Sequence, residues 1–216
     1  MMNIDLNKLI SVLNSKKYII YNDFNRLNIV GIRHIGKEIN KFDDTICVFY
    51  YSKDNPSQLS SNEKRSVYDL GNGVNVVLYQ FPATTEPGKS YLLNPINKKG
   101  TAILAEGQYI NTYKIDMHNG KYEALCQRLK NVCVYRDADK DELYEMEGKE
   151  WGMFGINIHR ASQWRILQWI DKNSAGCQVI QDIKDFDVLM GLARVHKELY
   201  ANVFTYTLIT DENYLQ

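Results

Sequence analysis

The stretch "GINIHRASQWRILQWIDKNSAGCQVI" (155–180) joins a histidine at a strand end to a cysteine in a tight turn. The run "MFGINIH" (153–159) predicts a strand ending at His159, where a side chain can project from the rim of a sheet. Small residues in "SAGC" (174–177) allow the backbone before Cys177 to bend tightly and approach a bound group. The connecting segment is long enough to turn back and place His159 beside Cys177.

The rest of the chain has mainly the pattern of strands. Strands are predicted for residues 17–21, 27–34, 45–51, 74–81, 101–109, 131–137 and 203–210. Helices are predicted for residues 5–16, 121–130 and 182–200, the first and last because apolar residues recur at helical spacing. The polar stretch 52–66 and the acidic stretch 137–150 are predicted to be loops. The pattern therefore indicates one α+β domain, mainly β, with two or three helices. Residues 1–80 supply a helix and strands to it, and residues 80–216 hold the candidate site.

Composition excludes several classes of function. The 26 basic side chains equal the 26 acidic ones, and no long basic run is present, which argues against nucleic-acid binding. No run approaches the roughly 20 apolar residues of a membrane span. The N-terminus "MMNIDLNKLISVLNSKK" lacks the pattern of a secretory signal, so we expect synthesis in a cytosol. The four cysteines lack C-x-x-C spacing, so neither a disulfide framework nor a zinc knuckle is expected.

Two interpretations of the cysteine and the histidine follow from the residues alone. A thiol is a useful nucleophile only as a thiolate, so a positioned imidazole beside Cys177 would serve cysteine chemistry. The turn also leaves the Cys177 N–H to point at an oxyanion. The other interpretation is a buried, inert thiol and an unrelated histidine. With four histidines and four cysteines in the chain, only the local context favours a pair.

The quoted stretch resembles the L,D-transpeptidase catalytic domain (YkuD-like) family of peptidoglycan enzymes. That family carries a histidine followed, after a gap, by Ser/Thr-His-Gly-Cys, and here His159 and Cys177 stand 18 positions apart. Upstream, "TTEPGKSYLL" (84–93) resembles the Thr-Pro-x-Gly-x-Phe entry to a strand, and "FGINIHRA" (154–161) resembles the Ile-His-Gly strand. The resemblance covers about residues 80–180. The ordered set "LNIVGIR", "ATTEPG", "GTAILAEGQY", "VYRDAD", "GINIHRA" and "SAGCQV" is similar to a branch of this family carried by phages and prophages.

The resemblance implies a β-sandwich or barrel core and a role for each site residue. Cys177 is the nucleophile that forms a thioester with a stem-peptide carbonyl, and His159 is its general base. The carbonyl of Arg160 orients the imidazole. The N–H groups of Gly176 and Cys177 form the oxyanion hole, and Ser174 shapes the turn. No cofactor or metal is implied.

Two positions depart from the family pattern. Ala175 stands where the family has a histidine, and Val179 stands where it has arginine or asparagine. Both family residues hold substrate or oxyanion, so these departures bear on substrate choice and on the balance between transfer and hydrolysis. In "VYRDADKD", Arg136 and Asp137 are weak candidates for contact with the substrate.

The expected function is a cysteine-dependent enzyme of peptidoglycan stem peptides, with hydrolysis favoured over transfer, in phage-encoded cell-wall degradation. Its partners would be stem peptides and phage virion proteins, and its location the host cytoplasm, with release by a holin, or the virion. The alternative is a non-catalytic virion or cell-wall-binding protein that retains the fold. A zinc peptidase using His34, His118 and His159 with a carboxylate is disfavoured, because no His-x-x-x-His pair is present.

Overall fold

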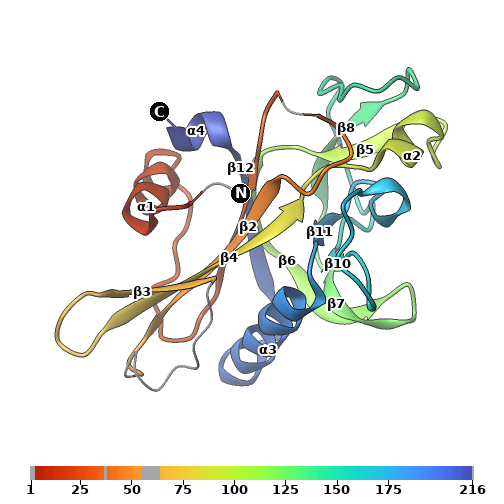
Figure 1. Ribbon diagram of the computed structural model, residues 1–216. Helices are drawn as coiled ribbons and strands as arrows, with labels where there is room; N and C mark the ends of the chain where they lie inside the picture. Colours follow the sequence, from red (N-terminus) through yellow and green to blue (C-terminus); the bar gives the residue numbers. More distant parts are fainter. Residues whose placement is uncertain (1–2, 37, 55–63, 216) are drawn as a thin grey trace.

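The computed structural model describes residues 3–36, 38–54 and 64–215, and its central element is a closed barrel of eight strands (Figure 1). The strand order is β11-β10-β7-β6-β12-β1-β2-β4, and β11 pairs with β4 to close the ring. These strands are β1 (Asn28–Arg33), β2 (Asp44–Ser52), β4 (Asn75–Thr84), β6 (Gly107–His118), β7 (Tyr122–Gln127), β10 (Ile158–Arg160), β11 (Gln178–Ile180) and β12 (Phe204–Thr210).

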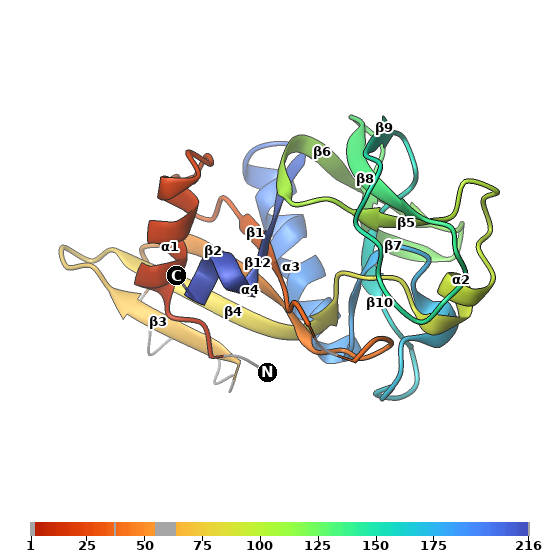
Figure 2. The same cartoon turned by 90° about the horizontal axis from the view of Figure 1, so that it is seen from above.

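Four further strands and a short helix extend the barrel. β3 (Arg65–Asp69) pairs with the outer edge of β4. β5 (Thr101–Leu104), β8 (Val132–Asp137) and β9 (Glu150–Gly152) form a second sheet of three antiparallel strands. α2 (Lys89–Leu93) follows β4, and a single 3₁₀ turn, Asp171–Asn173, precedes the cysteine turn. The second sheet lies beside β10 in Figure 2, and its residues Thr101, Ala102 and Arg136 line the cavity of the candidate site.

Two hydrophobic clusters explain why β1, β2 and β4 are continuously apolar. One face of these strands points into the barrel, where Ile46, Val48 and Phe81 are fully buried. The other face packs against α1 (Leu6–Ser15), which contributes Leu9 and Leu13. A strand buried on both faces reads as an unbroken apolar run rather than as an alternating one.

The two long helices lie on opposite sides of the β1, β2 and β12 strands (Figure 2). α1 begins after Asp5, whose side chain accepts a hydrogen bond from the Lys8 N–H, and this satisfies one of the unpaired amides of the first turn. α3 (Ile183–Leu199) begins in the same way after Asp182 and buries Leu189 and Met190 against the barrel core. The short α4 (Asp211–Leu215) follows β12 and packs beside α1.

The predicted class, mainly β with a few helices, is confirmed, but some elements differ. Residues 121–130, predicted to be a helix, form β7 instead. Asn119 and Gly120 both have positive φ, at 51° and 67°, which suits a tight hairpin, so the segment pairs with β6. Residues 17–21 are not a strand, and the strand predicted over 153–159 is limited to Ile158–Arg160. The strand predicted over 101–109 is interrupted between β5 and β6.

The predicted loops are described in part. The acidic segment joins the end of β8 to the start of β9 without regular structure. Of the predicted loop 52–66, residues 55–63 lie outside the described residues, and its last two residues belong to β3. The barrel takes strands from both sides of residue 80, because β4 crosses that position. In the described ranges, no helix is long and apolar enough to cross a membrane.

Candidate active site

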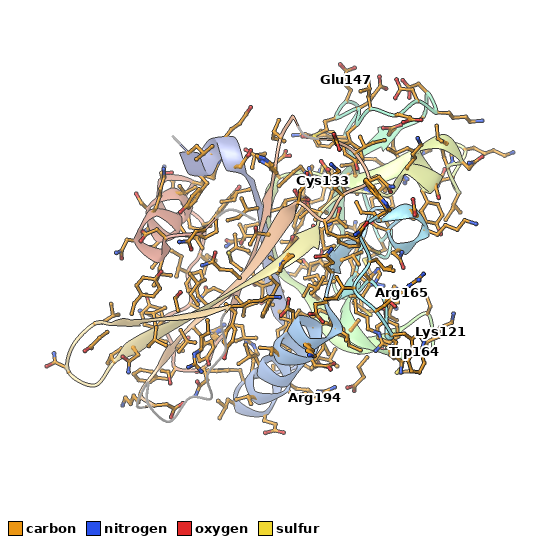
Figure 3. The ribbon with its side chains drawn as sticks, in the orientation of Figure 1. Lys121, Cys133, Glu147, Trp164, Arg165 and Arg194 are labelled. Carbon is orange, nitrogen blue, oxygen red and sulfur yellow. The ribbon has the colours of Figure 1, made fainter. Side chains whose placement is uncertain are left out.

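The quoted stretch forms two neighbouring parallel strands, with His159 in β10 and Cys177 at the residue before β11. β10 and β11 pair with Ile158 opposite Gln178 and His159 opposite Val179. Cys177 therefore lies in the turn that leads into the strand beside His159. Figure 3 shows Trp164 at the edge of the molecule, on the segment between the strands, where it is 86% exposed.

The turn before Cys177 is held by Ser174 and requires a glycine. The Ser174 hydroxyl accepts a hydrogen bond from the Gly176 N–H at 3.1 Å and donates one to the Cys177 carbonyl at 2.8 Å. Gly176 has φ +114°, and a Cβ there would lie 2.1 Å from the Ala102 carbonyl oxygen. Any residue larger than glycine is therefore excluded at position 176, both by the backbone conformation and by the nearby carbonyl oxygen. Ser174 thus makes hydrogen bonds to both residues that follow Ala175 in the turn.

The sulfur of Cys177 contacts two backbone groups of the neighbouring strand segment. It lies 3.4 Å from the Asn157 nitrogen and 3.5 Å from the Gly155 carbonyl oxygen. Burial raises the pKa of the thiol to about 11, and the Asn157 N–H opposes this rise. Cys177 is nevertheless partly exposed, whereas the other three cysteines are buried. The resting thiol is therefore neutral, and it is the most accessible of the four.

The imidazole of His159 is buried and fixed in one tautomer. Its Nδ1 lies 2.8 Å from the Arg160 carbonyl oxygen and 3.3 Å from the Tyr122 hydroxyl. A carbonyl oxygen only accepts, so Nδ1 carries the proton and Nε2 keeps its lone pair. Burial lowers the pKa of His159 to about 3, with His118 acting in the same direction. The ring is thus neutral, which is the form that a general base requires.

His118 belongs to this site, although the sequence analysis named it only in the zinc interpretation. Its ring stacks on the His159 ring, with centroids 4.2 Å apart and planes 23° apart. Its Nδ1 lies 3.0 Å from the side-chain nitrogen of Asn157. Asn157 therefore contacts both partners, with its backbone at the sulfur and its side chain at the second imidazole. Asn157 lies two residues before His159 in the sequence, and this spacing is the signal that could have identified Asn157 as a residue of the site.

Only some of the predicted site residues contact one another. Among the described residues, no hydrogen bond joins the sulfur of Cys177 to the His159 ring. Of the predicted oxyanion donors, the Gly176 N–H is engaged by Ser174, and the Cys177 N–H has no partner within the described part of the chain. Ala175 lines the cavity beside the sulfur.

The histidines of the zinc interpretation lie in two places. His34 is bonded to the buried carboxylate of Asp211, the first residue of α4, whereas His118 and His159 stack at the cysteine site. Within the described ranges, no three or more His, Cys, Asp and Glu side chains are grouped so as to hold a metal ion.

A cavity of about 250 Å³ lies beside Cys177. Gly155 and Ile156 line it from the segment before β10, and Ala102 and Arg136 line it from the second sheet. The thiol thus borders a space into which an acyl group can enter. Compared with known proteins, the chain matches no family model, no curated protein and no solved structure.

Proposed function

We propose that the protein is a cysteine-dependent enzyme of peptidoglycan stem peptides, with an L,D-transpeptidase-like fold and acyl transfer through a Cys177 thioester. One observation carries the proposal. The His159 imidazole, with Nδ1 bonded to the Arg160 carbonyl, lies on the strand that pairs with the segment after Cys177, and Cys177 lines a cavity. This arrangement gives a nucleophile, an oriented neutral base and space for a substrate.

The proposed reaction has two steps. Nε2 of His159 takes the thiol proton as the sulfur of Cys177 attacks the peptide carbonyl carbon. The oxyanion that forms accepts a hydrogen bond from the Cys177 N–H. The C–N bond then breaks, and the leaving amine takes the proton from His159. In the second step, His159 takes a proton from water, which attacks the thioester carbonyl carbon in hydrolysis, or from a second amine, which attacks it in transfer. The C–S bond then breaks, and His159 returns the proton to the sulfur of Cys177. We favour hydrolysis, in phage-encoded cell-wall degradation, on the strength of the sequence resemblance.

The test compares the wild type with Cys177→Ala on purified sacculi, with released muropeptides followed by mass spectrometry. Cys133→Ala is the matched control, because Cys133 is also a free cysteine but lies on the second sheet, outside the cavity lining. The proposal expects release by the wild type and the control and none by Cys177→Ala. Equal release by wild type and Cys177→Ala, or no release by either, would contradict it.

The second candidate is a non-catalytic protein that binds the cell wall. It is favoured by Ala175, which replaces the second histidine of the resembled motif, and by the absence of a bond between thiol and imidazole in the described structure. Co-sedimentation with sacculi separates the two. Binding by wild type and Cys177→Ala with no released muropeptide favours the binding protein, whereas release that depends on Cys177 excludes it.

A further inference from the structure

We propose that the cavity beside Cys177 receives the acyl-side residue of the substrate, and that Arg136 there binds a carboxylate on that residue's side chain. This inference rests on the proposed function, because it names the substrate class of the same site. Of the described residues that line the cavity, Arg136 is the one that carries a charge. The remaining lining is apolar or neutral, including Ile96, Phe154 and Asn97.

The guanidinium of Arg136 is held rigidly at the cavity wall. Its Nε donates to the Glu150 carboxylate at 2.8 Å, and its Nη1 donates to the Gly100 carbonyl at 3.3 Å. Its central carbon lies 4.7 Å from the centroid of the Phe154 ring. A guanidinium has five N–H donors, so its Nη2 group, which has no partner among the described residues, is left for a ligand. Such a fixed fork loses little entropy when it binds a carboxylate in a two-pronged manner.

The charge around Arg136 favours an anion despite its contact with Glu150. The same carboxylate also accepts a hydrogen bond from the Lys99 ammonium at 2.8 Å. These two cations hold the pKa of Glu150 below its usual range. One carboxylate between two cations leaves the group with a net positive charge, so a substrate carboxylate meets attraction at the cavity wall.

The charged side chains that line a second groove in the molecule are mainly acidic. A groove of about 600 Å³ is lined by Glu38, Glu142 and Asp171, with Lys89 as its basic member in the described chain. Its three carboxylates disfavour a substrate anion. The cavity at Cys177, at about 250 Å³, is also smaller than the roughly 300–1,000 Å³ of pockets for drug-sized ligands, so it suits a single residue. The carboxylate-bearing residue is therefore assigned to the cavity at the thiol.

The test uses two peptide substrates that differ only on the acyl-side residue, one with a side-chain carboxylate and one with the carboxamide. Arg136→Gln is expected to raise KM for the carboxylate peptide about 10- to 100-fold, with kcat changed little, because a hydrogen-bonded charge is lost. The carboxamide peptide should be affected less than threefold, on the order of a neutral hydrogen bond. Lys99→Gln is the comparison variant, since Lys99 shares Glu150 but does not line the cavity. It removes one charge of the group and no contact with the ligand, so it should reduce the preference for the carboxylate peptide by much less than Arg136→Gln does.

Binding to the Cys177→Ala protein, measured by calorimetry, tests the inference without turnover. Tighter binding of the carboxylate peptide that is lost on adding Arg136→Gln supports it. Equal affinities for the two peptides, or a preference that survives Arg136→Gln, overturns it. A wild type that cleaves neither peptide and releases nothing from sacculi contradicts the proposed function instead, and the binding measurement still decides the role of Arg136. Circular dichroism of each variant shows whether the loss of the Glu150 contact has unfolded it.

Discussion

The protonation state of Cys177 predicts how its alkylation responds to pH. The pKa of this thiol is raised from 9.0 to about 11 by burial, so at pH 7 its thiolate fraction is about 100-fold lower than that of an ordinary cysteine. A more basic thiolate is more nucleophilic, which returns roughly a factor of six to ten over two pKa units. We therefore expect alkylation by iodoacetamide at pH 7 to be at least about tenfold slower than in the denatured chain.

The assay measures this rate between pH 7 and 10 by quenching, digestion and peptide mapping. The slope is more informative than the rate itself, because limited access slows alkylation at every pH. A neutral thiol gives a rate that rises about tenfold per pH unit across the whole range. Cys177 should still react before the three buried cysteines. A rate that levels off below pH 8 would show a thiolate paired with a protonated His159, and the assignment of a neutral pair would be wrong.

Three further predictions concern stability. Gly176→Ala should lower the free energy of unfolding, measured with urea, by about 2–4 kcal/mol, because the backbone would be strained and the new Cβ would clash with a β5 carbonyl. Gly191→Ala is the control: Gly191 lies in α3 with open space around it, so this change should raise the free energy of unfolding by up to about 1 kcal/mol. Arg33→Met should lower it by about 3–5 kcal/mol, because the buried guanidinium pairs with carboxylates that would lose their partner; a loss under 1 kcal/mol would contradict this. Burial depresses the pKa of His159 to about 3 and of His196 to about 4, so the free energy of unfolding should be highest above pH 6.5 and should decrease as the pH falls toward 4, with His159 alone accounting for a loss of about 2 kcal/mol at pH 5. His159→Asn should make the free energy of unfolding less dependent on pH, and a wild type equally stable at pH 5 and pH 7 would refute the assignment of neutral buried histidines.

Much of the fold was predictable because its long strands carry strong local patterns. The apolar runs that became β2 and β4 and the capped helix after Asp182 were all predicted from local residues. Residues 121–130 were not, since their composition is compatible with a helix and only the hairpin at Asn119 and Gly120 decides for a strand. Closure of the barrel depends on pairing between distant segments, which no local pattern specifies.

The candidate site was predictable only where its residues lie close together in the sequence. The spacing of His159 and Cys177 within one stretch predicted that they would come close, and the pairing of β10 with β11 brings the two segments side by side. The stacked His118 could not be anticipated, because it reaches the site through the pairing of β6 with β7 and of β7 with β10. Arg136 reaches the cavity from the separate second sheet, which the sequence did not distinguish from the barrel strands.

The pairing of β11 with β4, which closes the barrel, must form before the candidate site around Cys177 is complete. β11 begins one residue after Cys177, and its partners on β4, Thr84 and Ala83, are distant in the chain. Hairpins such as β6–β7 join neighbouring segments and form early, whereas a pairing across so long a loop bears a larger entropic cost and comes late. The strand that follows Cys177 is therefore held on both sides, by β10 and by β4, only when the ring is closed. A partly folded chain carries His159 and Cys177 but not the closed barrel around their strands, so we expect the proposed activity only from the completed barrel.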